Sequence, residues 1–131
     1  MGKIERVISI SGDKGSIEVT VLFDSGASKT FIRKDIANCV CTIKEHEKPI
    51  DIFLADGKTA IKEIGICALE MKIEGHDIID VVHVLDADKS AAMYIGWSTM
   101  QRYGIGLKFG KTPKEDKLDF SKFVVELNEL I

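Results

Sequence analysis

Apolar and polar residues alternate along this sequence at a spacing of two, and this pattern restricts the fold more than any other feature. Within residues 16–23, one face of the chain is formed by Ile17, Val19, Val21 and Phe23. The same alternation recurs at Leu69, Met71 and Ile73. Because successive side chains of a β-strand point to opposite faces, both segments are predicted to be half-buried strands.

Turn signals divide the sequence into short strands joined by hairpins. Gly12-Asp13-Lys14-Gly15 separates strands predicted at 3–11 and 16–23, because glycine accepts the positive φ that tight turns need. A second turn, Ala55-Asp56-Gly57-Lys58, joins a strand at 50–54 to one that begins at Thr59. The fold is therefore predicted to be mainly β, and no phosphate-binding glycine loop of the dinucleotide-binding type is present.

Two segments carry polar or sulfur-containing side chains within apolar patterns. Residues 78–85 are apolar apart from Asp80 and His83, which predicts a strand buried on both faces and a hydrogen-bonded core histidine. Cys39 and Cys41 are predicted on one face of a strand, as small packing residues. Structural zinc sites space paired cysteines by at least two residues, so we expect no metal site here.

Helical signals are few and lie mainly in the second half of the chain. Residues 98–103 are predicted to form a short helix that ends at Gly104. Apolar residues near the C-terminus fall at helical spacing, which predicts a terminal helix. Residues 108–117, with one proline and several lysines, are interpreted as a solvated linker, and 31–38 is a further candidate helix.

Length and composition favour one domain. We expect a single domain over residues 1–131, with its core at about 3–109 and a linker and helix at about 110–131. The chain has 18 Lys and Arg against 21 Asp and Glu, so it lacks the basic excess that nucleic-acid partners select.

Hydropathy and cysteine content give expectations about location. No apolar run has the length needed to cross a bilayer, so we expect no membrane partner. The charged first residues do not fit a signal peptide. The three cysteines are too few and odd in number for a disulfide framework. A reducing, cytoplasmic location is therefore expected.

The segment Val21-Leu22-Phe23-Asp24-Ser25-Gly26-Ala27-Ser28 carries the chemistry. An apolar strand fixes the backbone of Asp24, Gly26 allows the turn to close, and small neighbours leave space around the carboxylate. The alternative interpretation is an ordinary loop turn, in which Asp, Ser and Gly are all common.

The same segment resembles the active-site motif of the retroviral-type aspartic proteases (retropepsins), in which two apolar residues precede Asp-(Ser/Thr)-Gly-Ala. Leu54-Ala55-Asp56-Gly57-Lys58 looks like the tip of the flap hairpin that folds over substrate in that family. Tyr94-Ile95-Gly96-Trp97 resembles the motif that precedes the family's short helix. The resemblance implies a single-domain, closed acid-protease β fold.

The resemblance also implies roles for individual residues. Asp24 would be the catalytic carboxylate, Ser25 would bond across a dimer, and Gly26 would let two carboxylates approach in near-coplanar geometry. Ala27 stands where pepsin-like enzymes carry a hydroxyl, and its absence should raise the apparent pKa of the pair and shift activity towards neutral pH. Ala55, Asp56, Gly57 and Lys58 would contact substrate, and Ile95 with Gly96 would support the active-site loop.

Counting carboxylates predicts the stoichiometry. Peptide hydrolysis of this type needs two aspartates that share a proton, and the sequence contains one Asp-Ser-Gly. We therefore expect a homodimeric aspartic endopeptidase with a peptide or protein substrate and no cofactor. A catalytically weak or inactive retropepsin-like dimerisation or peptide-binding module is the alternative, and an unrelated small β-barrel adaptor is a third reading.

Two features depart from the family pattern. Trp97 follows the Ile-Gly pair where the family usually has a polar or charged residue. The C-terminal segment is predicted to be a helix, whereas viral members close their dimer with terminal strands. The family's mode of dimer closure therefore does not transfer to this chain.

Overall fold

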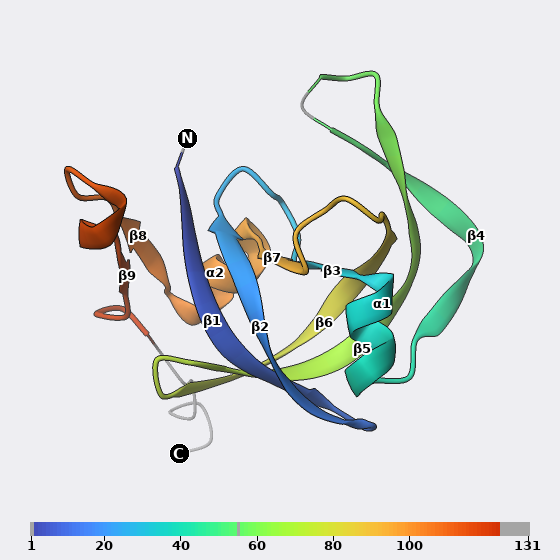
Figure 1. The fold of residues 1–131 in the computed structure, drawn as a ribbon, viewed down its shortest axis with the longest axis horizontal. Helices are drawn as coiled ribbons and strands as arrows, with labels where there is room; N and C mark the ends of the chain where they lie inside the picture. Colours follow the sequence, from blue (N-terminus) through green and yellow to red (C-terminus); the bar gives the residue numbers. More distant parts are fainter. Residues whose placement is uncertain (1, 55, 124–131) are drawn as a thin grey trace, which may run out of the picture.

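Two long β-hairpins form the frame of the computed structural model, which describes residues 2–54 and 56–123 (Figure 1). In chain order the elements are β1 (Lys3–Gly12), β2 (Gly15–Asp24), β3 (Phe31–Arg33), α1 (Lys34–Val40), β4 (Lys44–Phe53), β5 (Ala60–Ile73), β6 (His76–Asp86), β7 (Met93–Ile95), α2 (Trp97–Tyr103), β8 (Gly106–Lys108), the short 3₁₀ helix η1 (Pro113–Glu115) and β9 (Lys117–Asp119). The β1–β2 hairpin turns where the glycine pattern predicts it.

The main sheet closes on itself to form a barrel. Its strands run in the order β1-β2-β7-β3-β6-β5-β4, and a further pairing of β1 with β5 closes the ring. The pairs β2–β7 and β3–β6 are parallel, while the remaining pairs are antiparallel. β4 pairs only with β5, so the β4–β5 hairpin extends beyond the barrel.

Inward-facing apolar side chains fill the barrel. In β2 the buried residues are Val19, Val21 and Phe23, and in β5 they are Leu69, Met71 and Ile73. The predicted alternation is therefore confirmed in both strands. Burial of these faces removes apolar surface from water, which is the main driving force for folding of such a sheet.

The prediction that residues 78–85 are buried on both faces is wrong. β6 alternates for most of its length, and Ile79 and Val81 are 60% and 50% exposed. The barrel wall is a single layer at this point, so the outward side chains of β6 face solvent. A continuous apolar run predicts burial on both faces only where a second layer covers the sheet.

The predicted strand through Cys39 and Cys41 is also wrong. Cys39 lies in helix α1, and Cys41 caps that helix through its N–H, which donates to the carbonyl of Ala37 at 2.9 Å. The candidate helix at 31–38 is partly correct. Residues 34–38 are helical, whereas Phe31–Arg33 form β3. Ala37 and Val40 are fully buried, and their helical spacing fixes the face that packs on the barrel.

The second half of the chain holds the predicted short helix. α2 covers Trp97–Tyr103 and ends at Gly104, whose φ of 69° is left-handed. None of the helices in the described ranges is long and apolar enough to cross a membrane.

Elsewhere the element boundaries differ from the predictions. β4 begins at Lys44, six residues before the predicted strand. The stretch interpreted as a linker joins the strands of the β8–β9 hairpin, anchored by buried Leu118. The predicted C-terminal helix falls mainly on residues 124–131, outside the described residues.

Candidate active site

Asp24 is the last residue of β2, at the end of the barrel where the β4–β5 hairpin projects (Figure 1). β2 is held between β1 and β7, with Asp24 paired to Lys3 and Phe23 paired to Ile95. Phe23 and Ile95 are fully buried, whereas the Asp24 side chain keeps 15% of its surface exposed. The strand therefore fixes the backbone rigidly while the carboxylate reaches solvent.

The loop after Asp24 turns tightly around its carboxylate. The N–H of Gly26 donates to Oδ1 of Asp24 at 2.9 Å, and the N–H of Ala27 donates to the Asp24 carbonyl at 3.1 Å. Ser25 and Gly26 are exposed, and Ala27 is half-buried. The loop thus presents small residues to the outside beside an accessible carboxylate.

The first residues of α2 hold this loop in place through backbone hydrogen bonds. The N–H of Trp97 donates to the Ala27 carbonyl at 2.7 Å, and the N–H of Ser98 donates to the Ser28 carbonyl at 3.1 Å. A Cβ at Gly96 would lie 2.0 Å from the Lys29 carbonyl oxygen. Gly96 therefore permits a backbone approach that no other residue allows, and this gives the predicted Ile-Gly pair a physical role.

A buried hydroxyl chain, which the sequence did not reveal, ties the loop to β6. Thr30 Oγ1 accepts from the Gly96 N–H at 3.0 Å and lies 2.5 Å from Thr99 Oγ1. Thr99 in turn donates to Oδ2 of Asp80 at 2.6 Å, and Arg102 donates to Oδ1 of Asp80 at 2.9 Å. The one sequence signal for this network is an aspartate within an apolar run.

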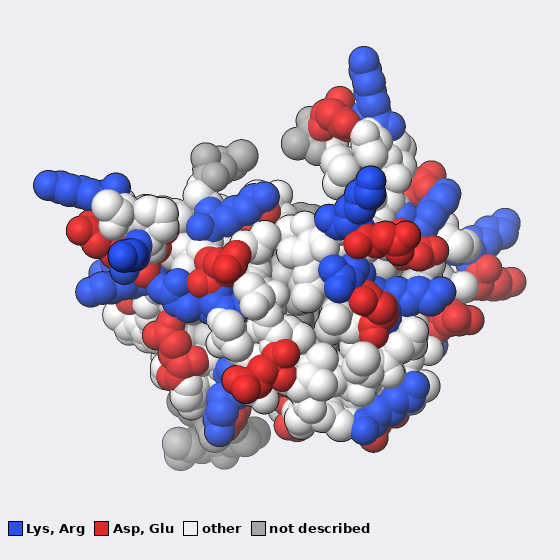
Figure 2. Space-filling view, viewed as in Figure 1, with Lys and Arg blue, Asp and Glu red and all other residues white. Residues whose placement is uncertain are grey.

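The β4–β5 hairpin projects from the barrel, as Figure 2 shows at the upper right of the molecule. Its turn is closed by Asp56, whose Oδ1 accepts from the N–H groups of Lys58 and Thr59, both at 2.8 Å. Gly57 has a left-handed φ of 71°. Asp56, Gly57 and Lys58 therefore form the predicted hairpin turn, while Ala55 lies outside the described residues.

A cavity of about 350 Å³ lies between the Asp24 loop and this hairpin. Its lining residues are Lys3, Asp24, Gly26, Ala27, Ser28, Phe31, Ile52, Phe53, Leu54, Ile61, Leu85, Ser90 and Tyr94. Most of these side chains are apolar, and Asp24 is the only carboxylate among them. Of the predicted site residues, the structure brings Asp24, Gly26 and Ala27 to the cavity, whereas Ser25 and the described turn residues Asp56, Gly57 and Lys58 do not line it.

The arrangement of these strands matches proteins of known structure. EIAV protease, solved with the inhibitor HBY-793, superposes with a TM-score of 0.61 at 16% identity, covering 82% of this chain and 94% of that chain. The retroviral protease-like domain of Ddi1 from Leishmania major gives a TM-score of 0.56 at 16% identity, covering 79% and 80%. No protein-family model and no curated protein sequence matches the chain. The chain has a retropepsin-like fold.

Within this retropepsin-like fold, Lys3 contacts the carboxylate directly. Its Nζ lies 3.8 Å from Oδ2 of Asp24, and its side chain is about half exposed. Both oxygens of Asp24 therefore have a partner within the chain, the Gly26 N–H on Oδ1 and the Lys3 ammonium on Oδ2.

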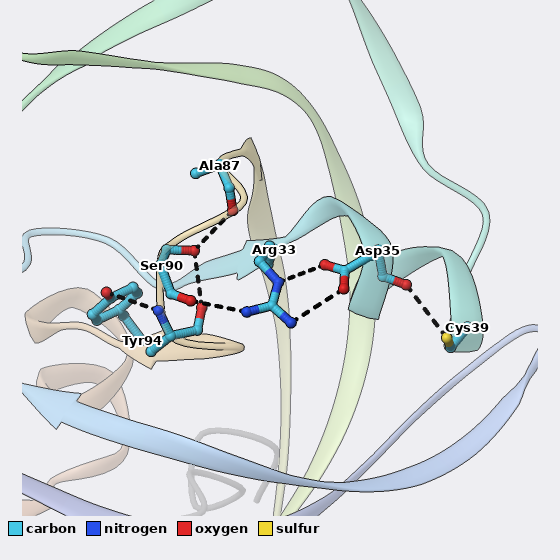
Figure 3. Close-up of polar contacts among 7 residues, drawn as sticks. Arg33, Asp35, Cys39, Ala87, Ser90 and Tyr94 are labelled. Carbon is cyan, nitrogen blue, oxygen red and sulfur yellow. Dashed lines mark hydrogen bonds and ion pairs between the residues drawn. The ribbon is translucent and has the colours of Figure 1, made fainter.

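Arg33 links the segment around Ser90 to Asp35, as Figure 3 shows. Its guanidinium donates to the Ser90 carbonyl at 2.9 Å and to Oδ1 of Asp35 at 2.6 Å. The hydroxyl of Tyr94 accepts from the Ala91 N–H at 3.1 Å in the same segment. Since Ser90 and Tyr94 both line the cavity, these bonds hold that side of it in place, although sequence reasoning did not find them.

Proposed function

We propose that this protein is an aspartic endopeptidase that acts as a homodimer, with Asp24 of each copy forming the catalytic pair. The observation that carries the proposal is an accessible carboxylate at the end of a buried strand, inside an apolar cavity beneath a projecting hairpin. One chain supplies one such carboxylate, and the reaction needs two. The exposed Ser25 and Gly26 leave the loop free to meet a second copy.

In the proposed reaction the two carboxylates share one proton, because like charges packed side by side do not both ionise. The ionised carboxylate takes a proton from water as the water oxygen attacks the peptide carbonyl. The protonated carboxylate gives its proton to the carbonyl oxygen. As the tetrahedral intermediate collapses, the carboxyl that took the proton from water gives it to the departing amine nitrogen. A hydroxyl of the intermediate returns its proton to the other carboxylate as the new carboxyl product forms, and the pair is back in its starting state.

The cavity supports an extended peptide with apolar side chains as substrate. Phe31, Ile52 and Leu85 line the cavity and offer apolar contact surface, and Phe53 of the hairpin is 64% exposed. Burial of such surface against substrate contributes to binding in proportion to the area removed from water. Closure of the hairpin over the peptide would also exclude water other than the nucleophile.

A second function is favoured by the partners of Asp24. Both oxygens of this carboxylate already have partners within the chain, the Lys3 ammonium on Oδ2 and the Gly26 N–H on Oδ1. If these contacts persisted in a dimer, they would compete with the bond between the two carboxylates, and the domain would then bind peptide or dimerise without hydrolysis.

Cleavage of an apolar-rich peptide library, with and without pepstatin, separates the two functions. We expect wild type and Asp77→Asn, which changes an exposed aspartate on β6, to cleave equally and to be inhibited. Asp24→Asn should lose cleavage, and light scattering should report a dimer for the active species. Equal cleavage by wild type and Asp24→Asn would overturn the catalytic pair. A stable dimer that cleaves nothing would favour the binding module.

We also propose a cytoplasmic location, which the cysteine content supports. Cys39, Cys41 and Cys67 are thiols, with Cys39 exposed and the other two buried. Burial raises the pKa of the Cys67 and Cys41 thiols above the ordinary value, which keeps them protonated and unreactive. A thiol reagent should therefore modify one cysteine in the native protein and three in denaturant. Fractionation of cells that express the tagged chain tests the location.

A further inference from the structure

The β4–β5 hairpin leaves the barrel at Glu63. β5 pairs with β6 only as far as Lys62, opposite Asp86. At the same level the β4–β5 ladder is interrupted, because Glu45 pairs with Gly65 and the next pair is Ile50 with Glu63. The β5–β6 ladder also shifts register between Glu63 and Gly65. Two irregularities therefore coincide where the hairpin leaves the barrel.

Side chains replace the missing backbone bonds at this point. Oε2 of Glu63 lies 2.7 Å from Nε2 of His46 and 3.0 Å from Nδ1 of His83. His46 lies on β4, Glu63 on β5 and His83 on β6, so a single carboxylate oxygen joins three strands. We refer to these three residues as the hinge cluster.

The hinge cluster contains an incompletely satisfied buried charge. Glu63 is 1% exposed, and its Oε1 has no hydrogen-bond partner among the described residues. Each histidine side chain keeps about a quarter of its surface exposed. Burying a carboxylate with one unbonded oxygen costs folding free energy. A further positive charge next to Glu63 would lower that cost.

Apart from the two histidines, one charged side chain among the described residues acts on Glu63. Lys29, in the loop after Asp24, is the remaining charged side chain that favours the ionised form of Glu63. The described residues include no group of three or more metal-ligand side chains arranged to hold a metal ion. His46 and His83 are the side chains in direct contact with Glu63 that can become cations by taking up a proton.

The hinge cluster is also coupled to the cavity beside Asp24. The ring of His83 lies 5.9 Å from the ring of Phe31, centroid to centroid, and Phe31 lines the cavity. The backbone N–H of His83 donates to the carbonyl of Thr30 at 3.0 Å, and Thr30 is the last residue of the loop that follows Asp24. On the hairpin side, Ile61 and Ile52 line the same cavity.

We propose that Glu63, His46 and His83 position the β4–β5 hairpin over the Asp24 cavity, and that proton uptake by this cluster tightens the hairpin at mildly acidic pH. This inference rests on the proposed function for its effect on catalysis, but the hinge itself does not depend on hydrolysis. Glu63 is a positioning residue, since it does not line the cavity that contains Asp24.

The chemistry of the cluster sets the direction of the effect. Imidazole ordinarily takes up a proton between about pH 5 and pH 8. The first proton converts a neutral donor into a cation, which strengthens its bond to the Glu63 carboxylate and neutralises the buried charge. A second proton would place two cations on one oxygen and is resisted. Acidification across this range therefore pins β4 and β5 more firmly to β6.

Hydrogen exchange of the hairpin amides, residues 50–61, measures this directly. Rates are corrected for the intrinsic pH dependence and compared at about pH 7.5 and about pH 5.5, on either side of the ordinary histidine range. In wild type we expect protection to rise about fivefold at the lower pH, because one existing hydrogen bond to Glu63 then has a cationic donor and is stronger. Glu63→Gln keeps the shape of the side chain but removes its charge, and its hairpin protection should not change with pH.

His46→Gln provides a second variant at a partly exposed site, should Glu63→Gln fail to fold. His46→Gln should reduce the pH response of the hairpin by more than half. The matched control is His76→Gln. His76 is the first residue of β6, at the end of the strand away from the hinge cluster, and its ring stacks on that of Phe120 with 4.2 Å between the centroids. This variant should respond as wild type does. Wild-type protection that does not change with pH, or an equal response in Glu63→Gln, would overturn the proposal.

Peptide kinetics separate failure of the hinge from failure of the proposed function. If the protein cleaves peptide, Glu63→Gln should change the pH dependence of KM more than that of kcat, because the hairpin closes over bound substrate. A KM profile identical to wild type would contradict the positioning role. A pH-responsive hairpin in a protein that cleaves nothing would support the hinge and reject only the endopeptidase.

Discussion

Lys3 lies directly across the β1–β2 ladder from Asp24, and its Nζ is 3.8 Å from Oδ2 of that carboxylate. This pairing places a positive charge beside the proposed catalytic pair. The methyl group of Ala27 gives the carboxylate no hydrogen bond, so among the described residues Lys3 is the side chain that pairs with it.

Removal of this charge should reduce the salt dependence of kcat/KM. Salt screens a half-exposed ion pair, so the wild-type value should change as salt is added, whereas Lys3→Met has no such pair to screen. Peptide cleavage measured over a range of salt concentrations tests this. Lys14→Met, at the far turn of the same hairpin, should keep the wild-type salt dependence. Equal salt dependence in wild type and Lys3→Met would contradict an electrostatic role for Lys3.

Gly96 should not tolerate a methyl group. In Gly96→Ala the new Cβ would lie 2.0 Å from the Lys29 carbonyl and 2.8 Å from the Ala27 carbonyl, so either the loop or the start of α2 must move. We expect a loss of about 2 kcal/mol or more in the free energy of unfolding, as for other overpacked sites. Urea denaturation measures this loss.

The control for that substitution is Gly106→Ala. Its new Cβ would lie 3.3 Å from the Asp119 Cβ, a contact that a small side-chain shift relieves. The loss there should be under about 1 kcal/mol, because reduced freedom of the unfolded chain offsets the contact. Equal losses in both variants would show that the close approach at Gly96 is unimportant.

Local periodicity explains which parts of the fold could be predicted. The alternation that ends at Phe23 is enough to predict β2, and it places Asp24 at the end of that strand. The burial of β6 could not be predicted, because exposure of Ile79 depends on whether another layer covers the sheet. The alternation within a strand shows which residues share a face, but it does not show whether another layer covers that face.

The polar networks could not be predicted from the sequence for a different reason. Thr30 and Thr99 are 69 residues apart in sequence, and neither has a local pattern that marks it. The sequence predicts a hydrogen-bonded core histidine at position 83. The bond to Glu63 confirms the hydrogen bond, but the side chain keeps 23% of its surface exposed and is not part of the core. Its partner could not be predicted, since the register shifts that bring His46 and Glu63 together are properties of the paired strands.

The buried hydroxyl chain should contribute measurably to stability. Thr99→Val keeps the shape of the side chain but leaves Oδ2 of Asp80 and the Thr30 hydroxyl without their shared partner. We expect a loss of about 1–3 kcal/mol in the free energy of unfolding, the cost of unsatisfied buried polar groups. Thr99→Ser should recover most of it, and Thr20→Val, at an exposed position on β2, should be nearly neutral. A loss in Thr99→Val no larger than in Thr20→Val would refute the role of the chain.

Acid should destabilise the native protein partly through Glu63. Burial by itself raises the pKa of this carboxyl, but hydrogen bonds from His83 and His46 outweigh burial and hold the pKa below the ordinary value of 4.5. Because the folded-state pKa is depressed, the stabilising contribution is present above the unfolded-state pKa and is lost as pH falls through the folded value. The relevant window therefore lies below about pH 4.5.

The measurement is urea denaturation of wild type and Glu63→Gln at neutral pH and at several values below about pH 4.5. Glu63→Gln should be less stable at neutral pH, and its stability should fall less steeply in acid. Some acid dependence should remain, because Asp35 beside Arg33 also has a lowered pKa. Glu70→Gln, at an exposed position on the same strand, should follow wild type. If Glu63→Gln lost stability in acid as steeply as wild type, the Glu63 carboxylate would not be a source of acid sensitivity, and the hinge cluster would lack the buried charge on which its response to protons depends.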